Sequence, residues 1–252
     1  MIYNPQIHKL GRKAVKTDSR SLKLARYLTP SFTNPQTLSW TKNVTSFGMM
    51  KNNQLGCCTI SGCGHQEQVW SLNASSEITV SDTIILDAYE QWCGYNPSDP
   101  NSDQGGVELD VLTDWRKNGL GGHKLDAFVA VNLKNLREVH RAMNLFGGVY
   151  IGVGLPITAQ NQAIWDVVPN AGPDGEVGSW GGHCVQIPNY DQTNTTLTCI
   201  TWGSLQPMTN RFFSKYVDEV WALVGADWFR SSGVDPTGLN LQQLLADVSQ
   251  IQ

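Results

Sequence analysis

Apolar and small side chains recur at helical spacing through the first half of the chain. The clearest stretch covers residues 58–70, where Ile60 and Cys63 fall on one face of a helix. Residues 81–95 and 107–120 repeat this spacing and carry glycines near their ends, as helix C-caps commonly do. The pattern therefore predicts three helices in this half.

The second half alternates short apolar runs with turn-forming residues, which is typical of strands. The predicted strands cover residues 125–132, 149–156, 183–191, 195–204 and 219–228, with the spacing of an antiparallel sheet. Residues 133–148 and 239–250 have amphipathic helical patterns, and residues 207–219 are expected to form a helical turn or loop.

A helical first half and a strand-rich second half together predict an α+β fold. We expect a basic arm and linker at residues 1–39, followed by one domain at residues 40–252. Within that domain a helical lobe is expected over about residues 40–125, a β-rich lobe over about 126–230, and a terminal helix over about 239–250.

Composition supports a folded, water-exposed domain. The 252 residues are 40% hydrophobic and include nine tryptophans, so the chain can bury a substantial core. No apolar run approaches the ~18 residues that a membrane helix needs. No apolar secretory segment is visible near Met1, so we expect a cytoplasmic or virion-associated protein whose six cysteines are reduced. A disulfide between Cys63 and Cys93 is the one pairing that stays open.

Charge is unevenly distributed along the chain. The net charge is only −4, but residues 1–30 hold seven Lys and Arg residues against the single acid Asp18. A basic arm of this kind can bind nucleic acid, an acidic partner, or the acidic body of its own domain, and we favour the last. A role as a propeptide stays open, although the arm is too short for a folded inhibitory domain.

Cys58 is the strongest candidate nucleophile. It follows a polar, glycine-containing turn, and the predicted helix starts directly after it. Unpaired N–H groups and the helix dipole at such a position favour the thiolate, which attacks once a base can reach it. A small core residue beside a turn is the plainer explanation. The adjacent Cys57 is expected to point into the wall.

His183 is the expected general base, because it lies between Gly182 and an apolar strand far downstream of Cys58. Its plainer explanation is an edge-strand histidine bonded to a loop carbonyl. His65 lies within the central helix and is expected to be a hydrogen-bonded core residue. The other histidines carry no functional signal: His8, His123 and His140.

Three short motifs resemble conserved segments of a known protein superfamily. The run LGCCT at residues 55–59 resembles the nucleophile turn of papain-like cysteine peptidases, GGHCVQIPNYD at 181–191 resembles their histidine strand, and CITWGS at 199–204 resembles the strand that follows. The chain also resembles a phage and bacterial group of papain-like proteins with NxxLGCCT, GGH and TWG motifs. This resemblance implies a two-lobe fold with a cleft between a helical lobe and an antiparallel β-rich lobe.

The resemblance also implies roles for individual residues. A cysteine peptidase working through an acyl-enzyme would use Cys58, His183 and an oxyanion donor, for which Asn52 is preferred over Gln54. The cleft would be lined by four residues: Trp180, Trp202, Gly105 and Gly106.

The third catalytic position departs from the superfamily pattern. Ile200 stands where papain relatives carry the asparagine that orients the histidine, and Thr201 is expected on the opposite side of the strand. The expected constellation is therefore a Cys–His dyad, with the imidazole oriented by a backbone carbonyl, water or a side chain such as Asp166.

A second function class stays open. The changed catalytic positions and the basic arm also fit a papain-like binding or virion-structural module with weak or silent chemistry. The expected partner of the enzyme is a peptide or protein substrate, and the arm could make a virion or self-assembly contact. We expect no membrane contact, regard nucleic acid as a poor fit, and predict no cofactor or metal, since the cysteines lack C-x-x-C spacing and no phosphate loop is present.

Overall fold

The computed structural model describes residues 3–29, 33–74, 76–225, 228 and 239–250. Seven strands in these residues form one sheet in the order β2-β7-β3-β4-β5-β6, with β1 paired to β4, and every neighbouring pair is antiparallel. The strands are β1 (Thr37–Ser39), β2 (Leu125–Ala130), β3 (Val149–Leu155), β4 (Gly181–Asp191), β5 (Thr196–Thr201), β6 (Ser204–Thr209) and β7 (Val217–Gly225).

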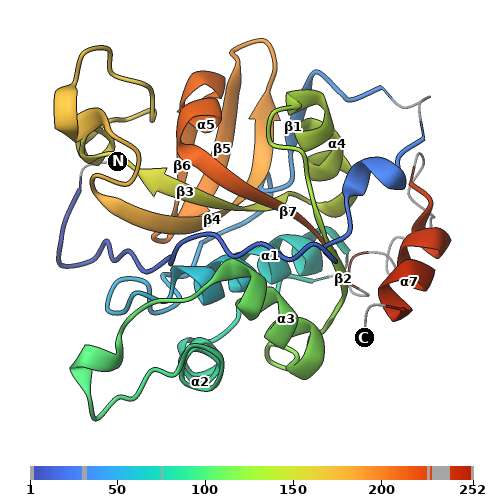
Figure 1. The fold of residues 1–252 in the computed structure, drawn as a ribbon, viewed down its shortest axis with the longest axis horizontal. Helices are drawn as coiled ribbons and strands as arrows, with labels where there is room; N and C mark the ends of the chain where they lie inside the picture. The colour runs from blue at the N-terminus through green and yellow to red at the C-terminus, as the bar shows by residue number, and fades with distance from the viewer. Residues whose placement is uncertain (1–2, 30–32, 75, 226–227, 229–238, 251–252) are drawn as a thin grey trace.

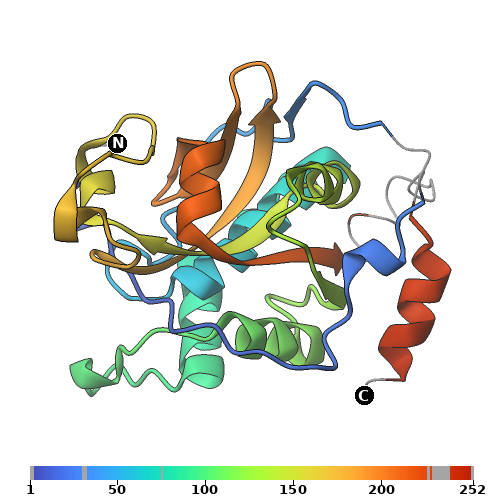
Figure 2. The same ribbon diagram turned by 45° about the horizontal axis from the view of Figure 1, so that its top comes forward.

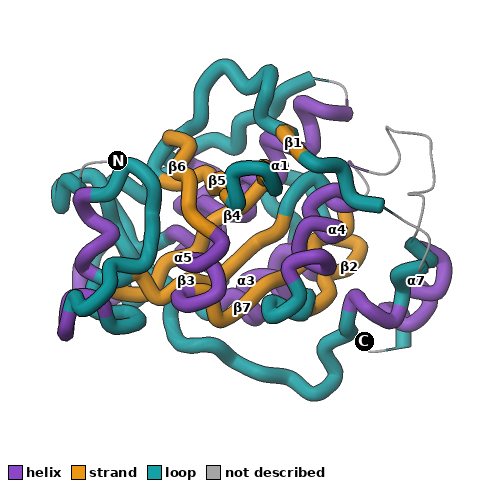
Figure 3. The backbone as a smooth tube through the Cα atoms, turned by 90° about the horizontal axis from the view of Figure 1, so that it is seen from above, coloured by secondary structure: helices purple, strands orange, loops and turns teal. Residues whose placement is uncertain are grey.

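Helices cover both faces of this sheet (Figures 1 and 3). Helices α4 and α5 pack on one face, while α1 packs on the other with α2 and α3 outside it. Their bounds are α1 (Cys58–Ala74), α2 (Asp82–Cys93), α3 (Glu108–Asn118), α4 (Leu136–Phe146), α5 (Asn210–Tyr216) and α7 (Leu241–Ser249). Short 3-10 turns lie at η1 (Leu24–Arg26), η2 (Pro100–Ser102), η3 (Ile157–Asn161) and η4 (Gly172–Gly175).

Alternation along β3 shows how the sheet serves two cores. Ile151 and Val153 face the core under α4 and α5, whereas Tyr150 faces the core around α1. All seven residues of the strand are buried, which explains its nearly continuous apolar sequence. The Tyr150 hydroxyl donates a 2.8 Å hydrogen bond to the Thr59 carbonyl and so fixes the first turn of α1 against the sheet.

The N-terminal arm crosses the boundary between the sheet and the helical lobe. In Figures 1 and 2 its dark-blue trace runs between the strands and helices α2 and α3 before it reaches η1. It is bonded to both sides, since Lys13 N–H donates to the Gly106 carbonyl and Arg12 N–H donates to the Gly182 carbonyl. The arm therefore spans the two lobes.

The predicted α+β class is confirmed, and most predicted elements are present with boundaries shifted by a few residues. Two strands were missed. β1 lies in residues assigned to the linker. β6 covers residues 204–209, where the prediction placed the end of one strand at 204 and a helical turn or loop from 207. Residues 226–227, at the end of the last predicted strand, lie outside the described residues. None of the described helices has both the length and the apolar character needed to cross a membrane.

Candidate active site

Cys58 is the first residue of α1 and is 1% exposed. Burial raises the pKa of its thiol to about 12, although backbone hydrogen bonds at Cys184 and Gly11 act in the opposite direction. The thiol therefore lies against the residue that follows His183 and beneath the N-terminal arm. In this arrangement it is protonated at neutral pH.

His183, on β4, is fully buried. Its Nε2 lies 2.7 Å from Thr201 Oγ1, and its ring stacks on Trp202 with centroids 4.3 Å apart. The other ring nitrogen, Nδ1, is buried and has no hydrogen-bond partner among the described residues. Burial lowers the pKa of His183 to about 3, so the imidazole is neutral at physiological pH.

Thr201 corrects the expected orientation of this site. The sequence comparison placed it away from His183, but Leu197 and Cys199 of β5 share a core with Val185 of β4. Alternation along β5 therefore brings Thr201 to the His183 face, and Ile200 to the opposite face. The alternation of Leu197 and Cys199 with polar residues is visible in the sequence, and this signal would have identified Thr201 as the partner of His183.

Asp166 does not orient the histidine. Its carboxylate accepts hydrogen bonds from the Thr209 hydroxyl, the Arg211 guanidinium and the backbone of Val167. These contacts fasten the start of α5 to the loop between η3 and η4 that contains Asp166, which is a structural role. The hydroxyl of Thr201 supplies the orienting contact that was assigned to Asp166, a carbonyl or water.

Asn52 is 3% exposed and faces the arm. Its Nδ2 donates to the carbonyl oxygens of Lys9 and Leu55, both at 3.1 Å. The Lys9 carbonyl also accepts a 3.0 Å hydrogen bond from Trp202 Nε1. Two side-chain donors thus converge on one peptide carbonyl beside the site. The competing candidate Gln54 only contacts Lys51.

The cleft is filled by residues 9–13 of the arm. Gly106 N–H donates to the Gly11 carbonyl at 2.8 Å, and the fit is so close that a Cβ on Gly11 would lie 1.7 Å from the Gly56 carbonyl oxygen. A Cβ on Gly105 would collide with the Gly11 carbonyl at the same distance. Gly105 and Gly106 therefore do line the slot, and what they contact is this chain's own backbone.

Asp103 positions that glycine wall, a role that sequence reasoning missed. Its carboxylate accepts hydrogen bonds from the Gly56 N–H and from the Tyr89 hydroxyl. The Tyr89 oxygen in turn accepts from the Gly105 N–H at 2.8 Å. The turn before α1 and the glycine wall are thereby fixed to each other through one half-buried carboxylate.

Aromatic side chains close the other end of the slot. Trp180 packs against Trp202 at 5.6 Å and against Tyr3 of the arm at 4.7 Å. His8, which carried no signal in the sequence, is buried and packs on Trp202 at 4.8 Å. A hollow of 720 Å³ borders this cluster next to Gly203.

The remaining candidates have structural roles. The Cys57 thiol points toward the Met50 carbonyl and Ser61, and His65 Nε2 bonds the Gly48 carbonyl at 2.9 Å.

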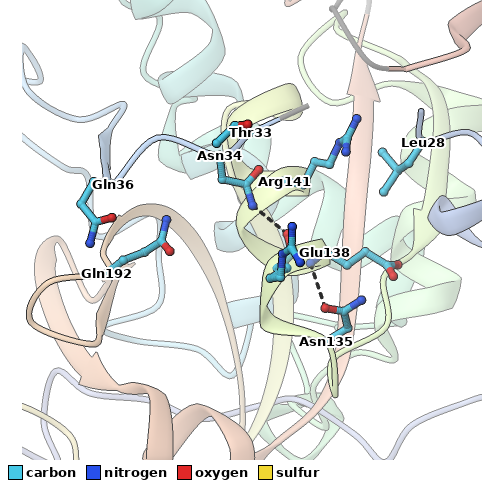
Figure 4. Close-up of a pocket in the computed structure, with 9 residues that line it drawn as sticks. Leu28, Thr33, Asn34, Gln36, Asn135, Glu138, Arg141 and Gln192 are labelled. Carbon is cyan, nitrogen blue, oxygen red and sulfur yellow. Dashed lines mark hydrogen bonds between the residues drawn. The ribbon is translucent and has the colours of Figure 1, made fainter. Parts of the chain in front are cut away.

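A separate hollow of 540 Å³ lies over the start of α4, and none of the candidate site residues lines it (Figure 4). Its lining is Leu28, Thr33, Asn34, Gln36, Asn135, Arg137, Glu138, Arg141 and Gln192.

Burial of two histidines predicts acid sensitivity. Burial lowers the pKa of His65 to about 4 and that of His183 to about 3, whereas in the unfolded chain each titrates at about 6.5. Below pH 6.5 the unfolded chain binds protons that the folded chain cannot, so stability present above that pH is lost as pH falls toward 4. Each histidine contributes roughly 1.4 kcal/mol per pH unit.

We expect His65→Gln to flatten this pH dependence in urea unfolding at pH 7, 6 and 5. Gln68→Asn alters a buried amide on the same helix without removing a titratable group, and should keep the wild-type slope. Identical slopes for His65→Gln and wild type would contradict the assignment.

Solved structures provide the likeness to known proteins. No protein-family model and no curated protein matches the chain. Xylellain, a cysteine protease from Xylella fastidiosa, superposes with a TM-score of 0.69 at 12% identity, over 89% of this chain and 98% of that one. Two other neighbours are proCathepsin B S9 from Trypanosoma congolense and digestive procathepsin L 3 from the larval midgut of Tenebrio molitor.

The proCathepsin B match has a TM-score of 0.56 at 11% identity and covers 88% of this chain and 87% of that one. The procathepsin L 3 match has a TM-score of 0.58 at 8% identity and covers 87% and 76%. None of the three is described as a phage protein, so the narrower resemblance to the phage and bacterial group rests on sequence motifs alone. The chain has the fold of the papain-like cysteine proteases.

Proposed function

We propose that the protein is a cysteine peptidase that acts through an acyl-enzyme. The observation that carries the proposal is the placement of Cys58 against the backbone of Cys184, the residue that follows His183, whose imidazole is held by Thr201 and Trp202. A helix-terminal thiol beside an oriented imidazole is the constellation that nucleophilic catalysis requires. The papain-like fold agrees with this chemistry.

The orientation of His183 defines the proton path. Nε2–H donates to Thr201 Oγ1, and Nδ1 has no hydrogen-bond partner among the described residues, the Cys58 thiol included. In the proposed path the Nδ1 lone pair accepts the thiol proton after the arm has left and the two groups have come together. The thiolate then attacks the peptide carbonyl carbon, and a C–S bond forms. The C–N bond breaks as the imidazolium returns the proton to the leaving amine, and a water molecule hydrolyses the thioester with His183 as base.

The Lys9 carbonyl marks where a substrate carbonyl would be stabilised. It accepts hydrogen bonds from Asn52 Nδ2 and Trp202 Nε1, and both donors are fixed by a buried environment. Donors held in place before the reaction stabilise negative charge on an oxyanion without reorganising. We assign this task to Asn52, assisted by Trp202 and by the Cys58 N–H.

In this arrangement the enzyme is latent. Residues 9–13 fill the slot, exclude water from Cys58, and occupy both the glycine wall and the Gly182 carbonyl. Departure of the arm would let water reach the Cys58 thiol. Because burial is what raises the pKa of this thiol, its pKa would then fall toward the ordinary value. Activation therefore requires displacement or removal of the arm.

We expect Gly11→Val to expel the arm, because any Cβ on Gly11 would overlap the Gly56 carbonyl. Iodoacetamide should then alkylate Cys58 at least about tenfold faster than in wild type, as judged by peptide mass analysis. Ala14→Val changes an exposed residue of the same arm and should leave the rate unchanged. Equal rates in all three proteins would mean that the arm does not protect the thiol.

Turnover of general peptide substrates by the Gly11→Val protein should disappear when Cys58→Ala is added. Cys199→Ser, at a buried thiol on β5 that bonds the Gln206 carbonyl, should retain turnover in the same background. If the Gly11→Val protein exposes Cys58 yet cleaves nothing, the binding or structural module becomes the better account.

Thr201→Val removes the hydroxyl at His183 Nε2 while nearly conserving side-chain volume. In the Gly11→Val background we expect kcat to fall by at least about tenfold, with a smaller change in KM, because the base loses its orientation. The pH profile of kcat/KM should shift as well. Thr198→Val, three residues earlier on the other face of β5, is the matched control. Equal kcat values for the two variants would remove Thr201 from the mechanism.

A further inference from the structure

The Arg12 side chain occupies an acidic pocket next to the candidate active site. It is 3% exposed, and its guanidinium pairs with three carboxylates. The contacts are Nε to Glu108 Oε1 at 2.9 Å, Nη2 to Glu219 Oε2 at 2.9 Å, Nη2 to Asp218 Oδ1 at 2.6 Å and Nη1 to Asp218 Oδ2 at 3.1 Å.

Both lobes contribute to this pocket. Glu108 is the first residue of α3, whereas Asp218 and Glu219 lie on β7. The floor is Gly152 of β3, where an added Cβ would lie 2.2 Å from the Arg12 Cζ. Any side chain at position 152 would fill the space, so the glycine keeps room for a guanidinium.

The pocket has a fixed register relative to the catalytic groups. Arg12 N–H bonds the carbonyl of Gly182, the residue before His183, while Gly106 bonds both Gly11 and Lys13. An extended peptide held between these walls must direct the side chain at the Arg12 position into the acidic pocket. The pocket therefore selects one position of any peptide that binds there.

An empty pocket would be electrostatically unfavourable. Glu108 is fully buried, and neither of its carboxylate oxygens has a hydrogen-bond partner among the described residues, since its ion pair with Arg12 Nε is not aligned as a hydrogen bond. Burial, followed by repulsion from Glu219, raises the pKa of Glu108 well above its usual range. Removing the guanidinium leaves two buried acids without a counter-charge, which is strongly unfavourable unless they bind protons or another cation.

We propose that this pocket is a specificity site for an arginine side chain, and that the substrates of the enzyme are peptides carrying arginine at the position that pairs with Gly106 and Gly182. Arg12 is its resident occupant and leaves with the arm. The claim that the occupant is a substrate rests on the proposed peptidase function, whereas the pocket itself is defined by the contacts of Arg12.

The geometry favours arginine over lysine. Three nitrogens of Arg12 reach three carboxylates arriving from different directions. An ammonium group is a compact charge and cannot match a planar fork of this kind at each contact. A lysine peptide would therefore bind more weakly than an arginine peptide of the same sequence.

The test vacates the pocket in the full chain with Arg12→Ala and supplies the side chain in solution. N-acetyl-arginine amide and its neutral isostere N-acetyl-citrulline amide are compared by thermal melting at millimolar concentration. The arginine compound should raise the Tm of Arg12→Ala by several degrees, whereas the citrulline compound should not. Neither should shift wild type or Lys16→Ala, whose lysine pairs with Asp110 at the surface.

Equal shifts with both compounds, or no shift with either, would overturn the proposal. Should Arg12→Ala fail to fold unaided, the comparison is made on its refolding yield after dilution from urea. Arginine's general effect on aggregation is then read from wild type refolded alongside. Arg12→Lys, which keeps a positive charge, is the second variant and should melt between wild type and Arg12→Ala.

A cleavage measurement then separates the two proposals. In the Gly11→Val protein, kcat/KM for a peptide with arginine at this position should exceed that of its citrulline analogue by about tenfold or more, and Glu219→Gln should reduce the ratio. Asp110→Asn, an exposed acid on α3, should not. Because melting needs no turnover, arginine-selective melting without cleavage retains the pocket and rejects the peptidase. Cleavage without any preference for arginine retains the peptidase function and rejects the arginine pocket as its specificity site.

Discussion

Backbone hydrogen bonds with Gly106 and Gly182 hold the arm across Cys58, and much of the arrangement follows from that clamp. The two glycines belong to different lobes, so residues 11–13 act as a shared strand between them. Bare backbone on both sides permits an approach that no side chain would allow. The clamp brings the Lys9 carbonyl to the side-chain donors of Asn52 and Trp202 and Arg12 to its carboxylates, and it covers Cys58.

Burial explains why the Cys58 thiol and the His183 imidazole are both neutral. Desolvation disfavours the thiolate and the imidazolium alike, and it shifts the two pKa values in opposite directions away from an ion pair. The nearby guanidinium does not compensate for this, because its charge is already matched by three acids. Proton transfer from Cys58 to His183 thus depends on hydration of the cleft.

Local sequence was sufficient to predict the α+β fold, because helical periodicity and strand alternation are short-range patterns. The roles of Cys58 and His183 were read from patterns of the same range, a turn before a helix and a glycine before a strand, and they stay predictions. Thr201 was predicted on the wrong face of β5 because its position was taken from an alignment of the TWG motif at Trp202. The alternation of the buried residues Leu197 and Cys199 along β5 gives the correct face. The partners of Arg12 could not be predicted. They lie on α3 and β7, and nothing near Arg12 in the sequence indicates which acids the fold brings to it.

The ion-pair cluster also has a consequence for biosynthesis. Arg12 is made early, but Asp218 and Glu219 follow 206 and 207 residues later. Contacts of such long sequence separation form late, after most of the chain has been ordered. During translation Arg12 would thus lack two of its three carboxylates until β7 (Val217–Gly225) has been made, so its acidic pocket is completed only when that strand joins the sheet.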